Sequence, residues 1–212
     1  MMQSKQQIEI PMLDELFRRV SSHTPNTLES GRGFPEAAVL LPITRSEQPE
    51  LILTLRASGL STHGGEVAFP GGRRDPEDPD LVFTALREAE EEIGLPPGLV
   101  EIIGPLSPLV SKHGIMVTPY VGLIPDFVEY RPNDGEIAAV FSVPLEFFRQ
   151  DTREHTHRID SQGRSWYVPS YRYGEFKIWG LTAIMIVELI NVLYDSKISL
   201  HTPPERFITF DS

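Results

Sequence analysis

Hydrophobic residues along the chain fall into short continuous runs in some stretches and into one-sided stripes in others. The runs have the length of β-strands, and turn-forming Gly, Pro and polar residues separate them. We expect strands at residues 37–43, 50–55, 66–69, 116–124 and 137–143, and a hairpin made by 166–168 and 175–178.

Three other stretches carry apolar residues at helical spacing. Residues Leu13, Leu16, Phe17 and Val20 lie i, i+3, i+4 and i+7 apart, which predicts a short N-terminal helix followed by a polar linker at 21–35. A last helix is expected at 181–194. The clearest helix spans 79–93, and its buried stripe is expected to consist of Val82, Ala85, Leu86, Ala89 and Ile93.

The sequence also marks the ends of the 79–93 helix. We expect Asp78 to be the N-cap, with Pro79 in the first turn. Gly94, followed by two prolines, predicts the C-terminal stop. Helices interspersed with strands predict an α/β (α+β) fold in which helices cover a mixed sheet.

The length of 212 residues fits one domain with extensions. We expect an N-terminal helical appendage and linker at 1–33, the main domain at 34–198 and a tail at 199–212. The last helix and Trp179 before it are expected to serve as core or as a homodimer interface. His155 and His157 lie in a polar stretch and are expected to be solvated.

Composition excludes several classes of function. The chain has 19 Lys and Arg against 30 Asp and Glu, a net charge of −11, so neither nucleic acid nor an anionic membrane is an expected partner. It has no cysteine, which excludes disulfides, thiolate zinc sites and cysteine nucleophiles. The most apolar stretch, 179–194, is too short to cross a bilayer, and no signal peptide is recognised at the start, so a cytoplasmic protein is expected.

Candidate chemistry gathers on the 79–93 helix. Glu88, Glu91 and Glu92 lie i, i+3 and i+4 apart, so their carboxylates share one face and repel each other. Three such oxygen donors suit a hard cation such as Mg²⁺ or Mn²⁺, although Glu-rich helix faces are commonly just solvated. Arg87 lies four residues before Glu91 and is expected to orient its carboxylate.

The loop before the helix strengthens the metal-site interpretation. Gly71 and Gly72 allow the backbone to approach the carboxylates and to offer a carbonyl or amides to a metal or phosphate. Between Glu66 and Glu92 there are nine acidic residues and three arginines, a concentrated negative site.

Gly72 and the segment Arg87-Glu88-Ala89-Glu90-Glu91-Glu92-Ile93-Gly94-Leu95 resemble the Nudix box, G-x5-E-x7-R-E-U-x-E-E-x-G-U. The second half matches at every fixed position. The first half departs, because Asp78 stands where the first Glu belongs and one extra residue separates it from Arg87. The resemblance implies a Nudix-type α/β/α sandwich.

The flanking sequence resembles the coenzyme A pyrophosphatase subgroup of that family. The residues that carry this resemblance are Leu53-Thr54-Leu55-Arg56, Leu60, His63, Gly65-Glu66-Val67, Phe69-Pro70-Gly71-Gly72 and Ile178-Trp179-Gly180-Leu181-Thr182-Ala183. Ala57 and Ser61 depart from the signature, which has Ser and Arg at these positions. The resemblance implies metal-dependent hydrolysis of coenzyme A to 3′,5′-ADP and 4′-phosphopantetheine.

The resemblance also implies roles for individual residues. Glu88, Glu91 and Glu92 would hold the metal, with the Gly72 carbonyl as a further ligand. Glu88 is the first candidate for general base and Glu136, in a loop outside the box, is the second; an exposed turn acid is the alternative for Glu136.

Substrate contacts are expected from Arg56, His63, Gly71, Gly72 and Arg73. For Arg56 an ion pair with Glu66 is the alternative, and for His63 a hydrogen bond to the backbone. Another nucleoside diphosphate derivative as substrate, such as ADP-ribose, NADH or a dinucleoside polyphosphate, remains open. So do a catalytically inactive nucleotide-binding module and an acidic interaction protein.

Overall fold

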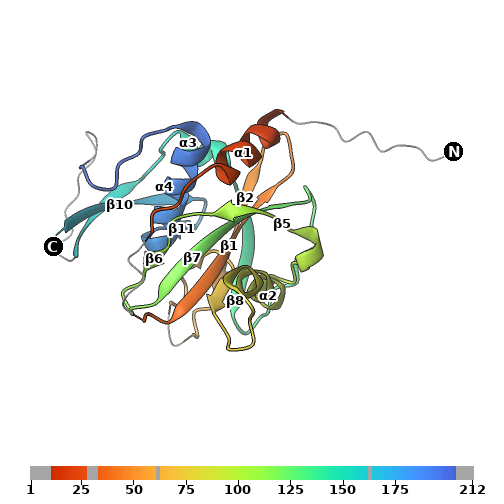
Figure 1. Ribbon diagram of the computed structural model, residues 1–212. Helices are drawn as coiled ribbons and strands as arrows, with labels where there is room; N and C mark the ends of the chain where they lie inside the picture. The colour runs from red at the N-terminus through yellow and green to blue at the C-terminus, as the bar shows by residue number, and fades with distance from the viewer. Residues whose placement is uncertain (1–10, 28–32, 61–62, 162–163, 204–212) are drawn as a thin grey trace.

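A computed structural model describes residues 11–27, 33–60, 63–161 and 164–203 of the chain. Over these residues the chain forms one large mixed sheet with helices on both faces, and a smaller antiparallel sheet beside it (Figure 1). The α/β class with a helix–sheet–helix sandwich is therefore confirmed.

The main sheet is built around two long parallel strands, β1 (Glu36–Thr44) and β7 (Met116–Ile124), which pair along their whole length. Its other strand pairs are antiparallel. The strand order is β3-β2-β1-β7-β5. Three further strands join this sheet: β4 pairs with β1, β6 with β7 and β8 with β2. Their bounds are β2 Glu50–Arg56, β3 Val67–Ala68, β4 Gly71–Arg73, β5 Glu101–Pro105, β6 Leu109–Val110 and β8 Ile137–Pro144.

Helices divide the core into two layers. α1 (Pro11–Ser21), α3 (Leu145–Arg149) and α4 (Gly180–Tyr194) pack on one face of the sheet, where most of the large buried side chains gather. Of the described α-helices, α2 (Leu81–Ile93) is the one that covers the other face, over a smaller cluster that includes Leu40, Ile52 and Ile124. In Figure 1, α2 lies below the sheet and α1, α3 and α4 above it. None of the described helices is both long and apolar enough to cross a membrane.

The predicted strands and helices are present with small shifts at their ends. The predicted hairpin is longer than expected, because β10 (Arg164–Tyr173) pairs with both β11 (Phe176–Ile178) and a strand that was not predicted, β9 (His155–Ser161). β5, β6 and the short 3₁₀ helix Pro97–Leu99 were also not predicted. His155 is exposed as expected, but His157 is half-buried, with its ring 5.9 Å from that of Trp179, so the prediction of a solvated His157 is wrong.

The N-terminal helix packs against the sheet layer. Leu13, Leu16 and Val20 are buried in the larger core cluster, while Phe17 is 41% exposed, so the predicted stripe is correct for three of its four members. Glu188 of α4 accepts hydrogen bonds from Ser107 and lies 3.0 Å from His23, which ties the segment after α1 to the fold. The division into residues 1–33, 34–198 and 199–212 stays a prediction.

Candidate active site

The helix that carries the carboxylates starts two residues later than predicted. Asp80 is its N-cap and accepts a hydrogen bond from the Phe83 amide at 2.8 Å, and Gly94 ends the helix in the left-handed conformation. The prediction that Asp78 caps this helix is wrong. In the turn from Asp75 to Asp78, the Asp78 amide donates to the Asp75 carbonyl and the Asp75 amide donates to the Asp78 carboxylate. The Asp78 side chain is buried just before the helix begins.

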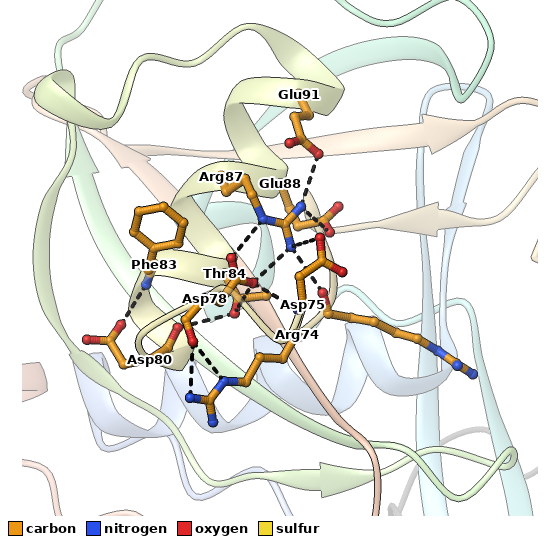
Figure 2. Close-up of polar contacts among 10 residues, drawn as sticks. Arg74, Asp75, Asp78, Asp80, Phe83, Thr84, Arg87, Glu88 and Glu91 are labelled. Atoms are coloured by element: carbon orange, nitrogen blue, oxygen red, sulfur yellow. Dashed lines mark hydrogen bonds and ion pairs between the residues drawn. The ribbon is translucent and has the colours of Figure 1, made fainter.

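Asp78 is instead the buried partner of Arg87. Its carboxylate accepts hydrogen bonds from Arg87 Nε at 3.1 Å and Nη2 at 3.0 Å, from the Thr84 hydroxyl at 2.9 Å and from the Asp75 amide at 3.0 Å (Figure 2). The Arg87 guanidinium lowers the pKa of Asp78 to about 2, so this carboxylate is ionised at neutral pH. The sequence signal at this position is that Asp78 stands where the Nudix box has its first Glu.

Arg87 connects the loop to two of the predicted metal ligands. Its Nη1 atom lies 2.9 Å from Glu88 Oε1 and donates to Glu91 Oε2 at 3.1 Å, which confirms the predicted Arg87–Glu91 contact. Its Nη2 atom also donates to the Arg73 carbonyl at 3.1 Å. Figure 2 shows the guanidinium between Asp78 on one side and Glu88 and Glu91 on the other. One arginine therefore sets the orientation of both carboxylates relative to the glycine turn.

The buried face of α2 differs from the prediction in a way that matters for the site. Ala85, Ala89 and Ile93 are fully buried as expected, whereas Val82 and Leu86 are only half-buried. Thr84 and Glu92 are buried in addition. Periodicity alone cannot place a Glu in the interior, because the burial of a carboxylate depends on partners from elsewhere in the chain.

Glu92 finds these partners on β2 and β4. Its Oε1 atom accepts a hydrogen bond from Arg56 Nη1 at 3.0 Å, and its Oε2 atom accepts one from the Gly71 amide at 3.1 Å. Burial raises the pKa of Glu92 to about 7, against the lowering effects of the Gly71 amide and Arg56, and the charge of Glu88 adds to the rise.

Glu88 lies directly against the second glycine of the turn. A Cβ atom built on Gly72 would come within 2.5 Å of the Glu88 carboxylate, so only glycine leaves room for it. Burial raises the pKa of Glu88, Arg87 lowers it, and the charges of Glu91 and Glu136 raise it further. The negative groups at 88, 91 and 136 therefore act on one another, as expected for a cluster of acids.

Glu136 is brought to this cluster by the loop after β7. The Glu136 carbonyl accepts a hydrogen bond from the Ala57 amide at 2.7 Å, and the Asn133 amide donates to the Glu92 carbonyl at 2.9 Å. The pairing of β2 with β8 shifts register between Leu55 and Arg56, immediately beside this contact. The loop is therefore anchored both to the end of α2 and to the end of β2.

Of the residues predicted to contact substrate, Arg56 and His63 are paired with carboxylates, whereas Arg73 is exposed. Arg56 pairs with Glu92, and the alternative ion pair with Glu66 is wrong because Glu66 pairs with His63, at 2.7 Å from Nδ1. The His63 ring also makes an edge contact with His113, 5.4 Å between centroids, which the sequence did not suggest. The Arg73 side chain is exposed beside the turn. Ser61 lies outside the described residues.

Comparison with known proteins agrees with this arrangement. The NUDIX domain matches residues 34–161, which is more than half of the chain. The chain belongs to the Nudix family. Proteins named "Uncharacterized Nudix hydrolase NudL" from Enterobacter sp. (strain 638) and Shigella sonnei (strain Ss046) are each 43% identical to this Nudix chain, over 84% of it and 92% and 93% of their own lengths.

A solved structure supports the same fold. The MutT/nudix family protein from Enterococcus faecalis aligns with 90% of this chain and 71% of its own, with a TM-score of 0.52 at 14% identity. By its family match and its NudL relatives, the protein is a Nudix-type pyrophosphohydrolase that acts on a nucleotide derivative. Nudix hydrolases generally use divalent metal ions.

The side chains present fit such an ion in their chemistry. Among the residues that the structure describes, no three Asp, Glu or His side chains converge in a metal-binding geometry, and the carboxylates are held by arginines and an amide. However, the side-chain donors are all carboxylate oxygens, and their mutual repulsion contributes to the raised pKa values of Glu88 and Glu92. A divalent cation would relieve that repulsion, so the donor set suits Mg²⁺ or Mn²⁺.

Proposed function

We propose that this Nudix hydrolase cleaves the diphosphate bridge of coenzyme A, or of its acyl or oxidised derivatives. One water molecule is added across the P–O–P bond, which yields 3′,5′-ADP and 4′-phosphopantetheine or its derivative. The observation that carries the hydrolytic part is the placement of Glu88 and Glu92 against Gly72 and Gly71. Coenzyme A as the substrate is supported by the resemblance of Leu53 to Gly72 to the subgroup signature.

The chain's own residues supply separate parts of this reaction. Glu88, Glu91 and Glu92 would hold the divalent ion, with the Gly72 carbonyl as a further ligand, and Arg87 orients Glu88 and Glu91. When bound, the ion supplies neutralisation of phosphate charge and a more acidic water. Glu88 is the candidate that takes the proton from the attacking water, because it lies inside the cluster, against Gly72 and beside Arg87.

Phosphate groups of the substrate need hydrogen-bond donors that are not already engaged with the carboxylate cluster. Arg73 is exposed next to the Gly71–Gly72 turn, and His63, in the loop between β2 and β3, is held by Glu66 at the end of that loop. We assign these two residues to substrate phosphates. The Gly71 amide is committed to Glu92, so its contribution is to hold that carboxylate.

Product analysis by mass spectrometry tests the proposal. Purified protein with Mg²⁺ or Mn²⁺ should convert coenzyme A to 3′,5′-ADP and 4′-phosphopantetheine, at a higher kcat/KM than ADP-ribose, NADH or diadenosine polyphosphates. Glu92→Gln should abolish this turnover and serves as the control for contaminating enzymes. Cleavage of another substrate in the panel, with coenzyme A intact, would replace the substrate assignment; no turnover of any of them would favour an inactive nucleotide-binding module.

A further inference from the structure

Arg56 faces the same side of the sheet as α2. Leu53 and Leu55 of β2 pack in the larger core cluster on the other face, whereas the Arg56 side chain reaches Glu92 on α2. Its guanidinium meets Glu92, 36 residues along the chain, at 3.0 Å. The Arg56 side chain is 22% exposed and that of Glu92 only 4% exposed.

The Glu92 carboxylate is held at both of its oxygens. Arg56 donates to Oε1 and the Gly71 amide donates to Oε2, which fixes both the position and the plane of the group. Gly71 cannot take a side chain here without collision, because a Cβ atom would come within 2.4 Å of the Ala38 carbonyl oxygen. The position of the amide donor is thus fixed by the sheet. Among the described contacts, Arg56 is the one side chain that donates a hydrogen bond to the Glu92 carboxylate.

The backbone around Arg56 is held as firmly as its side chain. The Arg56 amide donates to the Glu66 carbonyl and the Arg56 carbonyl accepts from the Gly65 amide, both at 3.0 Å. The next amide, of Ala57, donates to the Glu136 carbonyl at 2.7 Å. These bonds fix the backbone from which the Arg56 side chain extends to α2 and contacts the carboxylate cluster.

We propose that Arg56 is a positioning residue: it acts on the reaction through Glu92, and it does not read a phosphate of the substrate. The inference rests on the proposed function insofar as Glu92 is taken as a metal ligand. Hydrogen-bond partners of metal ligands orient those ligands, and their loss weakens metal binding or activity by roughly 10- to 100-fold.

Mn²⁺ binding, followed by electron paramagnetic resonance, tests the first half of the proposal without any substrate. Arg56→Met should weaken Mn²⁺ affinity by roughly 10- to 100-fold, and Arg56→Lys, which retains the charge, should recover part of it. Arg45→Met is the matched control, because Arg45 also forms an ion pair, with Glu101, but at the far end of β1. Combined with Glu92→Gln, Arg56→Met should cost little more, since the two act as a unit.

Unchanged or tighter Mn²⁺ binding in Arg56→Met would overturn the proposal, provided that its thermal melt shows a folded protein. Arg56→Lys keeps the test decisive if Arg56→Met does not fold. An additive loss in the double variant would also overturn it. None of these outcomes depends on which diphosphate the protein hydrolyses.

Turnover of coenzyme A and 3′-dephospho-coenzyme A tests the second half. A positioning role predicts that Arg56→Met lowers kcat by roughly 10- to 100-fold on both substrates alike, with little change in KM. A phosphate-reading role predicts a higher KM and a larger loss on coenzyme A than on its dephospho form, and this result would overturn the proposal. If the wild-type protein hydrolyses neither, the proposed function fails, and the Mn²⁺ titration still decides the role of Arg56.

Discussion

Asp78 and Arg87 form a two-point ion pair that joins the turn at 75–78 to the carboxylate-bearing helix, with nitrogen–oxygen distances of 3.1 and 3.0 Å. Asp78 is 3% exposed and precedes α2, whereas Arg87 lies in its middle. The same guanidinium contacts Glu88 and Glu91. Asp78 therefore helps to orient both carboxylates through Arg87, although it does not contact either of them itself.

Replacing Asp78 with Asn should therefore damage both stability and catalysis. The substitution leaves partly buried Arg87 donors without a charged acceptor, which costs about 1–3 kcal/mol in the free energy of unfolding. We expect kcat to fall together with stability, because Glu88 and Glu91 lose their common anchor. Urea denaturation and steady-state kinetics check this, with Glu77→Gln, an exposed neighbour, as the control. Wild-type stability in Asp78→Asn would show that the ion pair contributes nothing.

The pH dependence of that loss has a definite sign. The pKa of Asp78 falls from an ordinary value of 3.8 to about 2 in the folded protein. Its stabilising contribution is thus complete above pH 3.8 and disappears as the pH falls through 2. The difference in unfolding free energy between wild type and Asp78→Asn should shrink over this window. A difference that stays constant down to pH 2 would contradict the role of the ionised carboxylate.

Glu92 should behave in the opposite way in metal-free protein. Its pKa rises from 4.5 to about 7, so ionising it within the fold costs stability as the pH rises from about 4.5 through 7, by about 1.4 kcal/mol for each pKa unit. Glu92→Gln should therefore gain stability relative to wild type between pH 5 and pH 8, while losing turnover. Thermal melts in EDTA across this range measure the effect, and the exposed Glu90→Gln should show no such trend.

The two candidate bases can be separated by kinetics. Loss of the true general base lowers kcat by roughly 10²- to 10⁴-fold with the fold intact. We expect that loss for Glu88→Gln and a smaller one for Glu136→Gln, since Glu88 contacts Gly72 and Arg87 inside the cluster. A loss below about tenfold for Glu136→Gln removes it as a base. A loss of 10²-fold or more there, with weaker effects at Glu88, would reverse the assignment.

Gly72→Ala tests the close approach of the turn to Glu88. The added methyl would lie 2.5 Å from the carboxylate, so the flexible Glu88 side chain must move while the backbone can stay. We expect a fall in kcat of at least tenfold with little change in melting temperature, in line with the sensitivity of catalysis to misplacement of about 1 Å. Gly98→Ala is the control, since nothing lies within 4 Å of its added Cβ. Wild-type kcat in Gly72→Ala would show that Glu88 need not occupy this position.

The sequence was sufficient for those parts of the fold and site that depend on local patterns. Apolar runs located β1, β2 and β7, and the spacing of Glu88, Glu91 and Glu92 located the carboxylate cluster. β9 was not predicted, since its sequence His155–Ser161 is mostly polar and lies at the edge of the smaller sheet.

The hydrogen-bond partners of the buried acids Asp78 and Glu92 could not be predicted from the sequence. The predicted cap was Asp78, whereas the structure caps α2 with Asp80, because the turn at 75–78 engages Asp78 before the helix begins. The pairing of Arg56 with Glu92 joins residues that are distant in sequence, and no periodicity reports such a contact.

The segment 111–115 between β6 and β7 bears on how the substrate preference of this protein could change. It closes on itself through Ser111, which accepts from Ile115 and Gly114, and in the described contacts it gives none of the bonds that orient Glu88, Glu91 or Glu92. Yet His113 in this segment touches His63, a proposed substrate contact. Substitutions there can alter which molecules are admitted while the hydrolytic centre keeps its geometry. Such a segment is a suitable target for a library that selects new substrates on an unchanged catalytic framework.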